Sequence, residues 1–185
     1  MTTLNVAILV GSLRKGSFSR QIAKALANLA PDNLKAGIVE IADLPLYNPD
    51  LDEGTPPAAW TAFRDQIRPV DGVLFVTPEY NRSVPGALKN AIDVGSRPYG
   101  SSVWSGKPGA VVSCSPGAMG GFGANHHLRQ SLVFLDIPTL QQPEMYLGHV
   151  DKMLNADGGI ASPESEKFLR DFMDKFARWI ERNHS

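Results

Sequence analysis

Residues 6–20 read VAILVGSLRKGSFSR, and the rest of the chain is arranged around this stretch. The apolar run that ends at Val10 predicts a buried strand, and apolar residues at helical spacing from Phe18 to Leu29 predict the helix that follows. The loop between them can bind an anion, because free backbone N–H groups and the positive end of the helix dipole point into it. The side chains that can add hydroxyl donors or charge are Ser12, Ser17, Ser19 and Arg14 or Arg20.

Two common phosphate motifs are excluded by the same residues. Gly11 and Gly16 have the spacing of a Walker A loop, but Ser17 stands where that motif has its lysine. The Gly-x-Gly-x-x-Gly fingerprint of dinucleotide sites is missing as well. What remains is a loop suited to one terminal phosphate. The alternative is an ordinary strand-to-helix turn whose serines cap the helix.

Composition restricts the class of protein. The chain has 185 residues, a net charge of −1 and one cysteine, Cys114. We expect a single domain over residues 1–185, no nucleic-acid partner, no internal disulfide and no metal site. No apolar run approaches ~18 residues and the first residues do not resemble a signal peptide, so we expect no membrane insertion and a cytoplasmic protein.

Strand and helix patterns alternate along the chain. Strands are expected at 5–10, 34–41, 71–77 and 108–115, with a short fifth strand beginning at 137–140. Helices are expected at 17–30, from Pro57, after Gly86, at 125–135 and from Pro163. Residues 42–57 form a long polar loop, 97–106 an exposed loop, and 141–161 an irregular segment. The last helix is expected to bury Phe168, Phe172, Phe176, Trp179 and Ile180.

This order predicts an α/β fold with a parallel sheet and helices on both faces. The continuously apolar run Gly72–Val76 is typical of a strand that is buried on both sides. Five strands over this length suit the flavodoxin-like order 2-1-3-4-5. Ligands then bind beyond the carboxyl ends of the strands, between strands one and three, where the loops after strands one, three and four meet.

These three loops suit a planar heterocycle with a phosphate tail. The first loop offers phosphate donors. The second, Pro78–Arg82, offers Tyr80, Asn81 and backbone N–H groups, and the third, Ser115–Gly123, has glycines that let a flat ring approach the backbone. FMN is the obvious candidate.

The motifs in these loops resemble a known family. GSLRKGS at residues 11–17 and PEYN at 78–81, followed by SVPGALKNAID at 83–93, are similar to signatures of the NAD(P)H-dependent FMN reductases. HLRQ at 127–130 and Pro143-Glu144 resemble the chromate- and quinone-reductase branch of that family. The resemblance implies a flavodoxin-like fold, bound FMN and ping-pong hydride transfer from NADPH or NADH to quinones. Azo dyes, flavins and chromate are further implied acceptors.

The resemblance also implies site residues. The phosphate would be held by Ser12, Arg14, Ser17, Phe18 and Ser19. The flavin would be lined by Pro78, Glu79, Tyr80, Asn81, Ser115 and Gly117. At one position the chain departs from the branch, because His126 stands where we expect a tyrosine that is associated, together with the glutamate of Pro-Glu, with a tetramer interface. His126 and Glu144 could make the same contact, whose strength would then depend on pH.

Several residues have a plainer interpretation beside the functional one. Cys114 could be a nucleophile assisted by His126 or His127, but its place at the end of an apolar strand favours a buried, inert thiol. Glu79 could be a general base, although flavin hydride transfer needs none, and we therefore assign no catalytic residue. Arg82 and Arg97 could bind an anionic substrate or be solvated surface residues.

Two functions remain after these considerations. The first is an FMN-dependent NAD(P)H oxidoreductase. The second is a flavodoxin-like electron carrier or FMN-binding module. A carrier is expected to have a strongly acidic docking face, and the near-neutral net charge of −1 argues against one. Apolar residues in segments 42–57 and 97–104 predict packing against a second subunit in a homodimer. The apolar residues concerned are Leu46, Tyr47, Leu51, Tyr99 and Trp104. The resemblance to the quinone-reductase branch implies a homotetramer, a dimer of such dimers joined near the fourth helix and Glu144.

Overall fold

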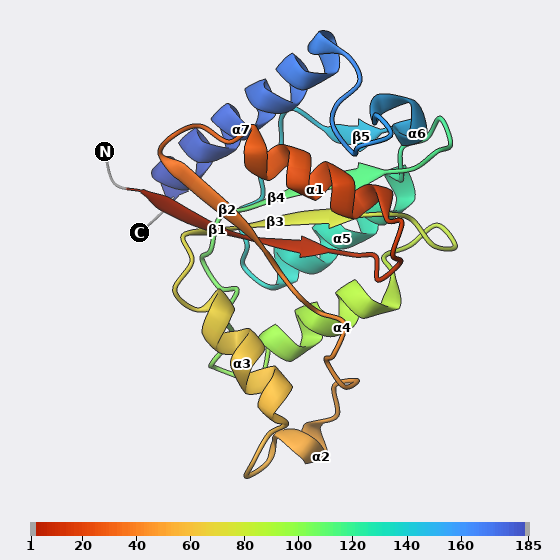
Figure 1. The fold of residues 1–185 in the computed structure, drawn as a ribbon. Coiled ribbons are helices and arrows are strands. Elements are labelled where there is room, and N and C mark those ends of the chain that lie inside the picture. Colours follow the sequence, from red (N-terminus) through yellow and green to blue (C-terminus); the bar gives the residue numbers. More distant parts are fainter. Residues whose placement is uncertain (1–2, 184–185) are drawn as a thin grey trace.

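A five-stranded parallel sheet forms the centre of the molecule (Figure 1). The computed structural model describes residues 3–183, so Met1, Thr2, His184 and Ser185, the ends of the expected domain, lie outside the described residues. The strand order is β2-β1-β3-β4-β5, which confirms the expected flavodoxin-like arrangement. The strands are β1 (Leu4–Val10), β2 (Leu34–Val39), β3 (Gly72–Thr77), β4 (Gly109–Cys114) and β5 (Met145–Leu147).

Helices cover both faces of the sheet, as the sequence predicts (Figure 1). The elements are α1 (Phe18–Asn28), α2 (Pro49–Asp52), α3 (Ala58–Ile67), α4 (Gly86–Gly95), α5 (Phe122–Phe134), α6 (Val150–Met153) and α7 (Pro163–Asn183). Helices α1 and α7 pack on one face, and α3, α4 and α5 pack on the other. Among the described residues, no helix has the length and apolar content needed to cross a membrane.

Alternation along the strands divides the apolar core into two layers. Ile8 of β1 packs with α1 and α7, whereas its neighbour Leu9 packs with α3 and α4. All residues of β3 and of β4 are buried. Central strands of a doubly covered parallel sheet have this continuous burial, and it explains the unbroken apolar run from Gly72.

The expected fifth strand is displaced along the chain. Residues 137–140 make only a single bridge, between Thr139 and Gly109, and the strand proper is β5. The segment does lie beside the start of β4, because Gly109 N donates to Pro138 O at 3.1 Å and Leu140 N donates to Gly109 O at 2.9 Å. Pro138 has no N–H to extend this pairing. Segment 141–161, expected to be irregular, contains both β5 and α6.

Two expectations about exposure are wrong. Trp104 lies in the loop expected to be exposed, yet its side chain is fully buried and its indole N–H donates to Ile92 O at 2.9 Å. In α7, Phe168 is 40% exposed, because the buried stripe runs through Leu169, Phe172, Met173, Phe176 and Ile180. Ser162 does cap this helix, through a hydrogen bond from Ser165 N at 3.1 Å.

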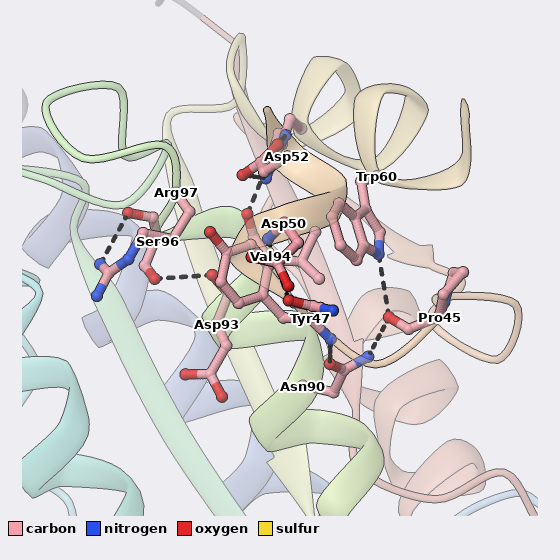
Figure 2. Close-up of polar contacts among 12 residues, drawn as sticks. Pro45, Tyr47, Asp50, Asp52, Trp60, Asn90, Asp93, Val94, Ser96 and Arg97 are labelled. Atoms are coloured by element: carbon pink, nitrogen blue, oxygen red, sulfur yellow. Dashed lines mark hydrogen bonds and ion pairs between the residues drawn. The ribbon is translucent and has the colours of Figure 1, made fainter. Parts of the chain in front are cut away.

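Segment 42–57 is anchored to α3 and α4 by polar contacts (Figure 2). The carboxylate of Asp52 accepts from Nη1 and Nη2 of Arg64 at 2.9 and 2.8 Å, and both side chains are buried. Tyr47 N donates to Oδ1 of Asn90 at 2.8 Å, and Trp60 Nε1 donates to Pro45 O at 3.0 Å. The expected long loop is therefore a structured arm that carries the short helix α2.

Candidate functional site

A recess lies at the carboxyl ends of β1, β3 and β4, where the sequence predicts that three loops meet. Its volume is about 160 Å³. The residues that line it are Ser12, Arg14, Ser17, Phe18, Ser19, Pro78, Glu79, Tyr80, Cys114, Ser115 and Pro116. Nine of the eleven predicted cofactor-binding residues are in this set, and Asn81 and Gly117 are not.

The first loop presents the N-terminus of α1 to the recess. Ser17 is the N-cap, and its Oγ accepts from Arg20 N at 3.1 Å. Phe18 and Ser19 lie between this N-cap and Arg20, in the first turn of the helix. Their N–H groups have no partner within the helix and are available to an anion. Ser12, Ser17 and Ser19 are buried around this point. The helix-capping interpretation of the loop is confirmed by Ser17, and phosphate binding stays a prediction for the same serine, which also lines the recess.

The two arginines of this stretch have different surroundings. Arg20 forms a two-point ion pair with Glu40, whose pKa the hydrogen bond from Arg20 lowers. Arg14 is exposed, lines the recess, and donates from Nη2 to Gly16 O at 2.9 Å. Its guanidinium lies 5.8 Å from the centre of the Phe18 ring. Arg14 is thus the cation that can turn toward an anion in the recess.

The second loop forms a tight turn over residues 80–83. Tyr80 N donates to Ser83 O at 3.1 Å, and Ser83 N donates to Tyr80 O at 2.9 Å. Asn81 and Arg82 are at its corner with positive φ angles of 50° and 63°. Asn81 is therefore exposed at the tip of the turn, whereas Pro78, Glu79 and Tyr80 face the recess.

The third loop uses most of its glycines for packing. A Cβ on Gly120 would lie 2.5 Å from the backbone of Tyr146, and one on Gly148 would lie 2.5 Å from Ala118 O. Gly120 and Gly121 also have positive φ angles. These glycines let the loop lie flat on residues 146–148. Gly117 N donates to Ser115 Oγ at 3.1 Å, which orients Ser115 at the edge of the recess.

Cys114 and Pro116 are lining residues that the sequence reasoning did not assign to the cofactor. Cys114 is buried, its Sγ lies 3.3 Å from Ser19 Oγ, and burial raises the pKa of its thiol to about 11. Such a thiol stays protonated and is no nucleophile, as its position at the end of a strand indicates. The signal that could have found both residues is their adjacency to Ser115, which was assigned.

The predicted substrate arginines are outside the recess. The Arg82 side chain is 79% exposed, and its Nη1 lies 3.5 Å from Glu79 Oε1. Arg97 borders a groove of about 540 Å³ between α4 and α5, together with Lys89, His127 and Phe134. Each arginine therefore has the surroundings of a surface residue in a single chain.

The adjacent residues His126 and His127 also have partners on the surface. His127 Nδ1 lies 3.0 Å from Ser83 Oγ, and His126 Nε2 lies 3.0 Å from the hydroxyl of Tyr146. Burial and a hydrogen bond with Glu144 raise the pKa of Tyr146. Within one chain His126 thus contacts Tyr146, and Tyr146 interacts with Glu144.

The recess fits the phosphate end of FMN by its donor set. The helix N–H groups, three serine hydroxyls and the exposed Arg14 guanidinium are groups of the kind that bind a phosphate monoester. Pro78, Tyr80 and Pro116 add flat side chains to the lining, and a ring can pack against such groups.

Comparisons with known proteins identify relatives of this chain. Residues 4–152 match the model of a family described as NADPH-dependent FMN reductase. A quinone reductase from Pseudomonas putida is 61% identical over 181 residues, which are 98% of this chain and 97% of that protein. A 2-hydroxy-1,4-benzoquinone reductase from a Burkholderia species is 51% identical over 177 residues, 96% of each chain. The solved structure of FerB, a flavoenzyme NAD(P)H:(acceptor) oxidoreductase from Paracoccus denitrificans, is 40% identical, with a TM-score of 0.93 and coverage of 99% of this chain and 100% of that one.

Proposed function

Because the chain belongs to the NADPH-dependent FMN reductase family, we propose that it is a quinone reductase that uses FMN to pass hydride from NADPH or NADH to a quinone. We further propose azo dyes, flavins and chromate as acceptors of the same reduced cofactor, and the cytoplasm, where both nicotinamide cofactors are available, as its compartment. The observation that carries the proposal is the recess at the switch point of the sheet, because it joins a phosphate loop to two loops that can border a ring.

The residues of the recess have distinct roles in this proposal. The N–H groups of Phe18 and Ser19, the hydroxyls of Ser12 and Ser17, and the Arg14 guanidinium would hold the phosphate. Pro78, Glu79, Tyr80, Ser115 and Pro116 would border the ring, with Asn81 and Gly117 contributing from just outside the recess.

The protein's contribution is binding and orientation. When bound, FMN supplies the redox chemistry, since it can take up two electrons as hydride and release them. The side chains of the recess do not have to move protons. Cys114 is held neutral by its raised pKa, and the Glu79 carboxylate accepts from Ala124 N at 3.0 Å. The exposed ring of Tyr80 and the flat side of Pro78 would exclude water from one edge of the site.

A second subunit would complete the site. The recess, at about 160 Å³, is smaller than the roughly 300–1,000 Å³ of typical ligand pockets, so a ring would extend beyond it. Leu46, Leu51 and Tyr99 remain exposed, at 78%, 47% and 91%, whereas Trp104 is buried and is no longer a candidate contact. We propose a dimer in which Leu46, Leu51 and Tyr99 contact the partner, and a dimer of dimers through α5 and Glu144.

Steady-state oxidation of NADPH and NADH, with and without a soluble quinone, tests the proposed activity. We expect FMN-loaded protein to oxidise at least one nicotinamide rapidly when quinone is present, and azo dyes, free flavins and chromate can then be compared with the quinone. FMN-loaded protein that oxidises neither nicotinamide, with any of these acceptors, would contradict the proposal and favour the electron-carrier alternative.

A further inference from the structure

The turn at residues 80–83 is held in a conformation that its own residues do not favour. Asn81 and Arg82 both have left-handed backbones, which asparagine tolerates and arginine seldom adopts. Two backbone hydrogen bonds between Tyr80 and Ser83 close the turn. A turn of this kind needs support from its surroundings to keep one shape.

Helix α5 supplies that support on both sides of the turn. Before the turn, Glu79 Oε2 accepts from Ala124 N at 3.0 Å. After the turn, Ser83 Oγ lies 3.0 Å from His127 Nδ1. Ala124 and His127 are both on α5, so one rigid element fixes both ends of the turn.

The contact from Glu79 replaces a missing helix cap. Gly121, the N-cap of α5, makes no side-chain hydrogen bond to the helix. Ala124 is three residues further on, and its N–H is the donor that a capping side chain ordinarily satisfies. Glu79 reaches this donor from another loop, its side chain is only 14% exposed, and its negative charge lies at the positive end of the helix dipole.

The sequence of α5 is adapted to this approach. A Cβ on Gly123 would lie 2.9 Å from Glu79 Oε2 and 2.8 Å from Arg82 O. Any larger residue at position 123 would therefore push the turn away from the helix. Gly123 and Glu79 act as two parts of one contact.

We propose that Glu79 is a positioning residue: by capping α5 it fixes the backbone of the turn that borders the flavin. The inference rests on the proposed FMN site. This role differs from the general-base interpretation of Glu79, because the carboxylate serves to join the turn to helix α5. A mechanical role requires an acceptor oxygen at this position, whereas an electrostatic effect on the flavin would require the negative charge.

Three variants separate these roles. Glu79→Ala removes the acceptor, and Glu79→Gln keeps an acceptor oxygen but removes the charge. Gly123→Ala leaves Glu79 in place and displaces the turn from the helix side. Glu166→Ala is the matched control, since it removes a carboxylate from an exposed ion pair with Arg170 on α7, away from the site.

Two measurements are made on each protein. The first is amide hydrogen exchange of Tyr80, Ser83 and Ala124 by NMR in flavin-free protein, and the second is FMN affinity by fluorescence titration. We expect Glu79→Ala and Gly123→Ala to speed exchange at these amides and to weaken FMN binding by roughly tenfold, because the first removes the carboxylate that joins the turn to α5 and the second pushes the turn away from α5. Glu79→Gln should stay within about threefold of the wild type, as the control should.

The outcomes distinguish this inference from the proposed function. Wild-type protein that binds no FMN would contradict the proposed function. If the wild type binds FMN and Glu79→Ala matches it in both exchange and affinity, only the positioning role fails. Equal losses in Glu79→Gln and Glu79→Ala would also overturn it, since they would assign the effect to charge. If Glu79→Ala does not fold, the other two variants decide. The positioning role predicts faster exchange and weaker FMN binding in Gly123→Ala but not in Glu79→Gln, and any other result contradicts it.

Discussion

Losing either partner of the buried ion pair between Asp52 and Arg64 should strongly destabilise the fold. The two side chains are 6% and 7% exposed and make two parallel hydrogen bonds. Arg64 also donates from Nε to Val94 O at 2.9 Å, and its guanidinium lies 5.8 Å from the centre of the Trp60 ring. Removing either partner leaves the other as a buried charge without its counter-ion.

The expected cost of Arg64→Ala or Asp52→Ala is about 3–5 kcal/mol in the free energy of unfolding. The double variant Asp52→Ala/Arg64→Ala buries neither charge, and its cost should be about 2–3 kcal/mol smaller than the sum of the two single costs. Urea unfolding of flavin-free protein, followed by circular dichroism, measures these values without stabilisation by ligand. Glu166→Ala, in an exposed pair, should cost at most about 0.5 kcal/mol.

The pH dependence of the same pair has a definite sign. The hydrogen bond from Arg64 lowers the pKa of Asp52 in the folded protein. The stability that this pair adds is therefore present above the unfolded pKa of about 3.9 and is lost as pH falls through the lower folded pKa. The difference in free energy of unfolding between the wild type and Arg64→Ala should therefore become smaller as pH falls through that range. The reasoning would be refuted if each single variant lowered the free energy of unfolding by less than about 1 kcal/mol. It would also be refuted if the effects of the Asp52 and Arg64 substitutions simply added in the double variant.

Three further predictions concern separate parts of the molecule. Arg14→Ala should weaken FMN binding on the order of tenfold to a hundredfold, because a charge-assisted contact is lost, while the unfolding curve of flavin-free protein stays unchanged. Gly95→Ala should lower the free energy of unfolding by about 1–3 kcal/mol in urea titrations, because a methyl group there overlaps the buried ring of Trp104. Cys114 should resist thiol reagents at pH 8 until the protein unfolds, because burial raises its pKa to about 11, and rapid labelling of native protein would contradict that.

The sheet order could be predicted because each central strand carries its own signal. Val73, Leu74 and Phe75 are apolar without interruption, and such a run is buried on both faces in a parallel sheet. The edge strand β5 has no such signal, since it spans three residues and only Met145 and Leu147 are buried. Ile137 and Leu140 are buried too, and burial alone does not distinguish a strand from a core-filling loop.

The recess could be predicted in outline for a different reason. Its residues follow directly after strands, and the carboxyl ends of parallel strands lie together. Contacts between distant segments could not be predicted. The hydrogen bond of Glu79 with Ala124 spans 45 residues, and nothing at either position indicates the other. The burial of Trp104 depends in the same way on Gly95, which has no side chain to keep the indole out of the core.

An anaerobic FMN titration of the purified protein tests the central claim most directly. The account predicts that the protein binds FMN, becomes yellow with an absorption band near ~450 nm, bleaches on addition of NADPH or NADH, and regains its colour when a quinone is added. A folded protein that remains colourless and takes up no FMN would contradict it.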